Sequence, residues 1–158
     1  MAKRIDYAQY SADTFKSLVA LDKTLAGSPL GLDLIDLIKI RASQLNGCLY
    51  CVDMHTKEAR LRGQRELKIH HLAFWRESEL FTAREKAALE WTEGLTRIGA
   101  HGVETEDFQE ARAVFSEKEL SDLTYVIGSI NFWNRIGVAF RPVPGSKDSM
   151  LGLDKAGL

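Results

Sequence analysis

The chain has little cysteine. Only two cysteines occur in its 158 residues, Cys48 and Cys51, and they form a single Cys-x-x-Cys. In a reducing compartment, two cysteines this close together are more typical of a catalytic or metal-binding pair than of a structural disulfide. The scarcity of cysteine therefore directs attention to one position in the chain.

An excess of one charge sign and a long apolar run are also missing. Lysine and arginine number 21 against 22 aspartates and glutamates, so the formal net charge is -1. This balance gives no electrostatic reason to expect a nucleic acid or an anionic membrane as a partner. No apolar run approaches the length of a bilayer span, and no apolar signal segment follows the basic residues near Met1. We therefore predict a cytoplasmic protein that binds neither nucleic acid nor membrane.

Proline is equally rare, and this favours helices. The three prolines, Pro29, Pro142 and Pro144, leave a long middle stretch without a helix breaker. No convincing period-two alternation bounded by hairpin turns occurs, so β-strands are not expected. The sequence predicts an all-α fold, a single-domain helical bundle over residues 1–158 with about six to eight helices.

Capping signals divide this middle stretch into predicted helices. Ser28-Pro29 and Asn46-Gly47 bracket a helix over residues 30–45, and a second helix should follow over residues 48–61. Capping boxes at Thr82–Glu85 and Ser116–Glu119 predict helices that reach Ile98 and Phe140. The acids of Thr105-Glu106-Asp107 suit the first turn of a shorter helix that ends near Phe115.

The helix over residues 48–61 would carry the chemistry. On it Cys48, Cys51 and His55 fall at i, i+3 and i+7, on one face together with Val52 and Ala59. Other side chains of this helix are expected to point elsewhere, namely Asp53, Lys57, Glu58 and Arg60. The free N–H groups and positive dipole end of a helix N-terminus favour a thiolate, and a nearby histidine adds to this effect. Two thiols one turn apart also allow a sulfenic acid to be resolved as a disulfide.

The preceding predicted helix contributes an acid. Apolar residues surround nearly the whole circumference of residues 30–45, as in a buried helix, and Asp36 lies among them. A buried carboxylate needs a partner. Two partners are open at this point: Lys39, three residues on, in a purely structural pair, or His55, which the carboxylate would orient and keep basic.

Two motifs resemble a known family. The stretch Ile40–Arg60, IRASQLNGCLYCVDMHTKEAR, is similar to the core signature of the alkylhydroperoxidase D-like proteins in the carboxymuconolactone decarboxylase superfamily. The stretch Asn131–Arg141, NFWNRIGVAFR, resembles the closing helix of that family. The resemblance implies a homo-oligomer, such as a trimer or hexamer, and a peroxidase that reduces hydroperoxides and is regenerated by an external dithiol, for example of the lipoyl type.

The resemblance also implies roles for individual residues. Cys51 matches the cysteine that becomes the sulfenic acid, Cys48 its resolving partner, and His55 the relay histidine. Asp36 stands where the family has glutamate, and Tyr50 where its founding members have a second histidine. The implied catalytic set is therefore Cys48, Cys51, His55 and Asp36, with no metal, haem or flavin required.

Several other interpretations stay open from the sequence alone. A zinc site would need further ligands from His70, His71 or His101, because only two cysteines exist. The cysteines could also be an inert core pair, the chain a lactone decarboxylase of the same superfamily, or a non-enzymatic, redox-responsive oligomer. Asn131, Asn134 and Arg135 form a polar cluster at i, i+3 and i+4, for which hydrogen bonding between helices or subunits is favoured over pocket lining.

Overall fold

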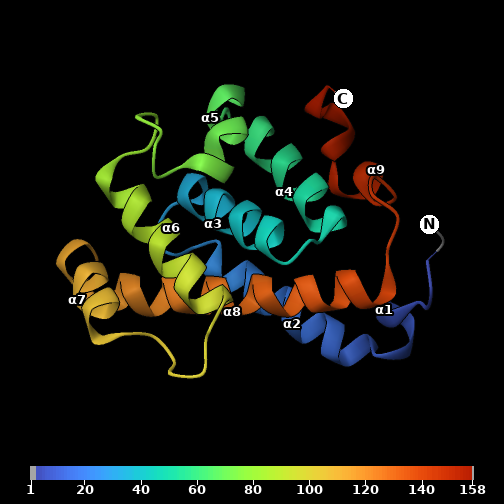
Figure 1. The fold of residues 1–158 in the computed structure, drawn as a ribbon. Helices are drawn as coiled ribbons and strands as arrows, with labels where there is room; N and C mark the ends of the chain where they lie inside the picture. The colour runs from blue at the N-terminus through green and yellow to red at the C-terminus, as the bar shows by residue number, and fades with distance from the viewer. Residues whose placement is uncertain (1–2, 158) are drawn as a thin grey trace.

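The computed structural model describes residues 3–157, and within this range the chain forms helices and loops without a β-strand (Figure 1). This confirms the predicted all-α class. The α-helices are α1 (Tyr7–Tyr10), α2 (Ala12–Leu25), α3 (Leu32–Leu45), α4 (Leu49–Leu61), α5 (Glu66–His71), α6 (Ala83–Thr96), α7 (Thr105–Val114), α8 (Glu117–Phe140) and α9 (Asp148–Leu151). Nine helices in the described range exceed the predicted six to eight because α1 and α9 are single turns of 4 residues each.

The predicted capping signals set the helix boundaries. Both capping boxes are present, with Thr82 and Ser116 each accepting a hydrogen bond from the backbone N–H of the glutamate three residues on. The longest helix, α8, has 24 residues and ends at Phe140, and its C-cap residue Arg141 directly precedes Pro142. The helix that carries the cysteines begins at Leu49, so Cys48 is its N-cap residue rather than its first helical residue.

A tight turn joins α3 to α4 and brings the two helices side by side. Gly47 has a φ of 65°, a left-handed conformation that suits glycine, directly after the C-cap residue Asn46. The backbone N–H of Cys48 then donates to the carbonyl of Ser43 over 3.0 Å. The α3–α4 hairpin therefore presents the cysteines at its closed end.

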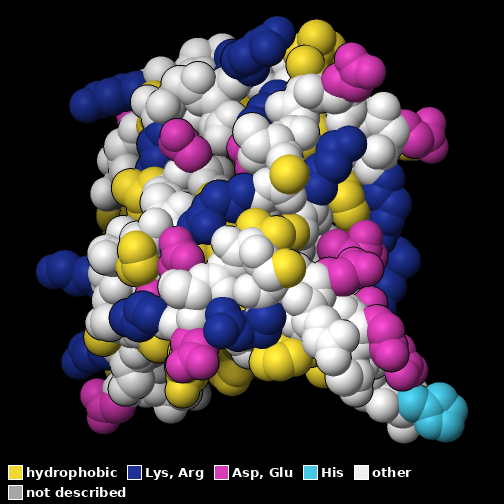
Figure 2. All heavy atoms as spheres, turned by 90° about the vertical axis from the view of Figure 1, so that its left-hand side faces the viewer, with side chains coloured by type: hydrophobic (Ala, Val, Ile, Leu, Met, Phe, Trp, Pro, Cys, Tyr) yellow, Lys and Arg dark blue, Asp and Glu magenta, His cyan; other side chains and the backbone are white. Residues whose placement is uncertain are grey.

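The core forms around α3, which is buried on most of its circumference as predicted. This helix packs against α4, α6 and α8, while α2 packs on α8. Figure 1 shows α8 running along the length of the molecule beneath α3 and α4. None of the helices in the described range combines the length and apolar character needed to span a bilayer. On the face at the α6–α7 end, acidic and basic side chains are interspersed (Figure 2).

The chain after α8 returns over α4 as a C-terminal strap, residues 142–157. Leu153 and Ala156, in a 3-10 turn at Leu153–Ala156, are buried against α4. The buried ammonium of Lys57 donates to Asp53 on its own helix over 2.8 Å and to Asp148 of the strap over 2.7 Å. Lys57 was predicted to point away from the packed side of α4, and this was wrong, because a segment distant in the sequence covers it.

Candidate redox site

Cys48 and Cys51 are joined as a disulfide at the N-terminus of α4, with their Cα atoms 5.4 Å apart. Both residues are only 2% exposed. The backbone N–H of Cys51 points at Cys48 Sγ over 3.4 Å, so the sulfur occupies the position of a capping acceptor. Because the unpaired N–H groups of a helix start stabilise negative charge, this position favours a thiolate at Cys48 when the pair is reduced.

The closing helix α8 approaches the disulfide through a glycine. A Cβ added at Gly137 would collide with Cys48 Sγ and lie 3.3 Å from Cys51 Sγ. One turn earlier, the carbonyl oxygen of Trp133 lies 3.9 Å from Cys51 Sγ. Gly137 therefore allows the backbone of α8 to form one wall of the site directly against both sulfurs.

A hydrogen-bond network holds the turn before Cys48 in place. The side-chain amide of Asn46 donates to Asn131 over 3.0 Å and to Asn134 over 2.9 Å, both on α8. The fully buried Asn134 in turn donates to the hydroxyl of Ser43 over 2.9 Å. Asn131 and Asn134 of the predicted polar cluster therefore make hydrogen bonds between helices and hold the turn before Cys48, whereas the side chain of Arg135 bonds, among the described residues, only to Asn131 within α8.

His55 lies one turn after Cys51 on the same helix and is buried. Its Nδ1 lies 2.7 Å from a carboxylate oxygen of Glu58. Burial opposes the ionisation of Glu58, but the hydrogen bond with His55 and the charges of His55, Lys39 and Arg62 outweigh it, and the pKa of Glu58 is lowered. An ionised carboxylate only accepts, so Nδ1 is the donor in this hydrogen bond. In the neutral form of the ring, Nε2 is then the nitrogen without a proton.

Glu58 was missed as a partner of His55 and was expected to point elsewhere, and this expectation was wrong. The signal was available, because residues three apart on a helix are neighbours and His55-x-x-Glu58 has that spacing. The acid was instead predicted on the preceding helix, at Asp36, where the family has glutamate.

Asp36 has a different partner from either of the two predicted. Its Oδ1 accepts a hydrogen bond from Arg62, at the end of α4, while Lys39 lies 3.9 Å from Asp22. Both proposed partners were wrong because the antiparallel hairpin brings the long arginine across to α3, a contact that spacing within one helix does not show. A catalytic role of Asp36 stays a prediction.

Only one of the two carboxylate oxygens of Asp36 accepts a hydrogen bond within the described residues. Its second oxygen, Oδ2, is buried and has no hydrogen-bond partner among the described residues. Burial raises the pKa of Asp36, and the hydrogen bond and charge of Arg62 only partly offset this effect. The charges of Glu58 and His55 also act on the pKa of Asp36, so the two carboxylates and the imidazole form one electrostatic cluster.

Tyr50, between the cysteines, is not poised to relay protons near neutral pH. Burial, together with Tyr7 and the carboxylates of Asp148 and Asp53, raises its pKa to about 12. In the part of the chain that the structure describes, no three histidine, cysteine, aspartate or glutamate side chains come together as a possible metal site.

Comparison with known proteins identifies the family. A family model described as the carboxymuconolactone decarboxylase family matches residues 12–94. The chain belongs to this family. The uncharacterized protein YdfG of Bacillus subtilis is 37% identical over 147 residues, covering 93% of this chain and 100% of YdfG.

Solved structures place the chain among the alkylhydroperoxidase D-like members of the carboxymuconolactone decarboxylase family. A protein of unknown function from Agrobacterium tumefaciens, for which a role as the antioxidant defence protein AhpD has been proposed, is 43% identical with a TM-score of 0.86. The match covers 90% of this chain and 98% of that one. The debrominase Bmp8 is 21% identical with a TM-score of 0.78 over 94% of this chain and 79% of its own, and it shares the fold.

Proposed function

We propose that the protein is a thiol-dependent peroxidase that reduces organic hydroperoxides through Cys48 and Cys51. The observation that carries this proposal is the arrangement of the pair: a disulfide at a helix N-terminus, with a histidine one turn on that an ionised glutamate orients. The alkylhydroperoxidase D-like family supports it, and a cytoplasmic, reducing location would keep the pair available for turnover.

The oxidative half-reaction uses Cys51 as the nucleophile. His55 Nε2 accepts the thiol proton of Cys51, while Glu58 holds the Nδ1 proton. The thiolate attacks the terminal oxygen of ROOH, so that an S–O bond forms and the O–O bond breaks. The departing alkoxide takes a proton from the imidazolium and leaves as ROH, and Cys51 becomes a sulfenic acid.

Cys48 then resolves the sulfenic acid. The helix N-terminus favours its thiolate, which attacks the sulfur of Cys51; the disulfide forms and hydroxide leaves as water after protonation. The sum is that one dithiol and one ROOH give one disulfide, one ROH and one water. An external dithiol, for example of the lipoyl type, reduces the disulfide by exchange and becomes a disulfide itself. In this scheme Asp36 tunes the charge of the cluster around His55 rather than touching the ring.

Steady-state consumption of cumene hydroperoxide with dihydrolipoamide as the dithiol tests the proposal. The wild-type chain should turn over, and Cys51→Ser should not. In Cys48→Ser, the sulfenic acid should accumulate on Cys51 and react with dimedone. Undiminished turnover by Cys51→Ser would overturn the mechanism.

The burial of both sulfurs favours a second candidate, a non-enzymatic, redox-responsive protein whose disulfide forms without sustained turnover. Repeated cycles with the dithiol would exclude it. A decarboxylase-like activity, by contrast, would survive replacement of both cysteines by serine.

A further inference from the structure

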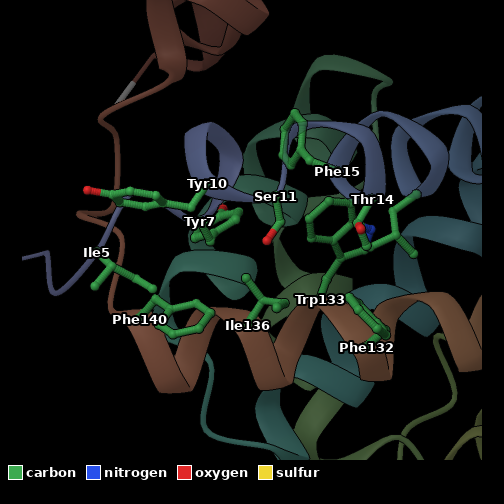
Figure 3. Close-up of a pocket in the computed structure, with 11 residues that line it drawn as sticks. Ile5, Tyr7, Tyr10, Ser11, Thr14, Phe15, Phe132, Trp133, Ile136 and Phe140 are labelled. Carbon is green, nitrogen blue, oxygen red and sulfur yellow. The ribbon is translucent and has the colours of Figure 1, made fainter.

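A groove between the N-terminal helices and α8 has no part in the mechanism so far. It has a volume of about 230 Å³ and is lined mainly by apolar and aromatic side chains. Figure 3 shows Trp133, Ile136 and Phe140 of α8 facing Tyr7 and Phe15 of α1 and α2. We name it the aromatic groove. Ser11 and Thr14 place hydroxyl groups on its α2 side.

The aromatic groove and the disulfide are linked through Trp133, which lines the groove and packs against the buried cluster that contains Cys48 and Cys51. At roughly 100° per residue, Trp133, Ile136 and Phe140 share one face of α8, and Gly137 lies on the adjacent face. Gly137 is in contact with both sulfurs, while Trp133 lines the groove with its ring and approaches Cys51 Sγ with its carbonyl. One helix therefore forms a wall of the groove and a wall of the redox site.

Four of the aromatic side chains in the groove wall are held in place by contacts within the protein. The indole N–H of Trp133 donates to Asp22 over 2.7 Å, and Phe15 meets the same indole edge-on at 5.7 Å between ring centroids. Tyr7 stacks on Phe140 at 5.8 Å. A ligand that packs against these rings costs little ordering of their side chains, which is a property of pre-formed ligand sites.

Size and chemistry define the ligand class. An apolar cavity of about 150 Å³ is enough to bind benzene, whereas drug-sized ligands occupy roughly 300–1,000 Å³. The 230 Å³ available here therefore suits a single ring with a short branched substituent. Flat walls set face-on and edge-on favour an aromatic ring over a linear chain.

We propose that the aromatic groove binds the aryl group of an arylalkyl hydroperoxide and so presents its peroxide group at the Trp133 end, next to Cys51. The inference rests on the proposed peroxidase function and narrows its substrate class. Hydrogen peroxide has no group to place in the groove and gains nothing from it.

The test fills the groove from an exposed position. Thr14 lines the groove on α2 and is exposed, so Thr14→Trp adds a ring to the groove without removing a buried side chain. Ser17→Trp, also exposed on α2 and not part of the lining, is the matched control. If Thr14→Trp fails to fold, as judged by circular dichroism, Thr14→Phe replaces it.

Two readouts are needed, one of which does not depend on activity. The first is binding of 2-phenyl-2-propanol, the alcohol product of cumene hydroperoxide, to the oxidised wild-type chain, followed by the NMR shift of the Trp133 indole N–H. The second is kcat/KM for cumene hydroperoxide and for hydrogen peroxide. Burying the aryl ring of the ligand in the groove should raise its affinity at least about tenfold. Because the tryptophan of Thr14→Trp would occupy that space, the variant should bind the alcohol about tenfold more weakly and have an about tenfold lower kcat/KM for cumene hydroperoxide. Hydrogen peroxide turnover and the Ser17→Trp control should be unchanged.

The inference is overturned if the alcohol does not bind, as when a second copy of the chain covers the groove, or if Thr14→Trp lowers both peroxide rates equally or neither. Failure of the two proposals is distinguishable. If the chain turns over cumene hydroperoxide and Thr14→Trp does not change that rate, only this inference fails. If the alcohol binds but no peroxide is consumed, the proposed function fails and the substrate assignment fails with it.

Discussion

At the scale of single residues, Glu58 decides which nitrogen of His55 carries a proton. Its ionised carboxylate accepts from Nδ1. In the proposed mechanism this leaves Nε2 of the neutral ring to take the thiol proton of Cys51. Glutamine keeps the size of the side chain but loses the charge that stabilises the imidazolium during proton transfer.

Glu58→Gln is therefore expected to slow the oxidation of the thiol pair by about 10–100-fold, part of the contribution of a general base. Stopped-flow measurement of peroxide consumption by the reduced chain gives this rate. Glu110→Gln, on the exposed surface of α7, is the control. Equal rates in the two variants would show that Glu58 does not support His55.

Asp36 makes a prediction about stability and pH. Its pKa is raised in the folded chain, mainly by burial, so the folded state holds this proton more tightly than the unfolded state. Relative to Asp36→Asn, the wild type should gain stability as the pH falls through the raised pKa, with the gain complete below the unfolded value. The same advantage should be lost as the pH rises.

Urea unfolding of both proteins across the acidic range measures this difference. A wild-type advantage that instead grows with pH would mean that the ion pair with Arg62 dominates over burial. The same variant tests catalysis: a lowered peroxidase rate would support a role for Asp36 in the proton relay, and an unchanged rate would make it a structural partner of Arg62.

At the scale of helices, the approach of α8 to α4 depends on one missing side chain. Gly137→Ala would drive a methyl group into Cys48 Sγ and should lower the free energy of unfolding by about 1–3 kcal/mol, the usual cost of overpacking. Gly128→Ala, on the same helix with open space at its Cβ position, should instead stabilise by roughly 0.4–1 kcal/mol. Chemical denaturation of the oxidised proteins gives both values, and equal effects would contradict the close contact.

Helix identity was readable from the sequence wherever local signals set it. The starts of α6 and α8 follow from their capping boxes, and α3 follows from the Pro29 and Gly47 signals. The end of α6 lies at Thr96, two residues before the predicted Ile98. The turns α1 and α9 could not be predicted, because 4 residues carry too little periodicity and the turns are held by contacts with distant segments. Arg4 in front of α1, for example, donates its backbone N–H to Phe140.

In the candidate site, too, contacts within one helix could be predicted from the sequence, whereas contacts between distant segments could not. The i, i+3, i+7 spacing correctly placed Cys48, Cys51 and His55 together, because all three belong to one helix and its cap. The partners of Asp36 and Lys57 are set by the hairpin and by the strap, and no pattern within one helix contains that information. The space at Gly137 likewise depends on how two helices far apart in sequence pack.

At the scale of the whole molecule, the C-terminal strap is fastened to α4 by one buried cation. Burial opposes the charge of Lys57, but the hydrogen bonds that its ammonium donates to Asp148 and Asp53 raise its pKa. Asp53 also accepts from the backbone N–H of Gly145 in the strap over 3.1 Å. Removing the ammonium would leave two carboxylates facing each other.

Lys57→Met is expected to lower the free energy of unfolding by about 1–3 kcal/mol, the cost of leaving charged acceptors without a donor. It should also speed hydrogen exchange in residues 145–157, measured by mass spectrometry, because the strap loses its attachment. The exposed Lys147 provides the control, Lys147→Met. Protection of the strap that is unchanged in Lys57→Met would show that Leu153 and Ala156 hold it without the ion pair.

Assembly into a trimer or hexamer is also a property of the whole molecule and stays a prediction from the family. Exposed apolar residues on α8, Tyr125, Phe132 and Val138, are compatible with a contact surface. The helical hairpin, its cap and its histidine lie within one chain, so the proposed chemistry does not require a second subunit.

The central claim is that the two thiols of one chain are the electron source for peroxide reduction. The most direct measurement adds one equivalent of cumene hydroperoxide to the fully reduced protein and then counts free thiols and the alcohol formed. The account predicts the loss of two thiols per chain, a mass lower by two hydrogens, and one 2-phenyl-2-propanol per chain. Persistence of both thiols with the peroxide unconsumed would contradict it and leave only the fold and the family in place.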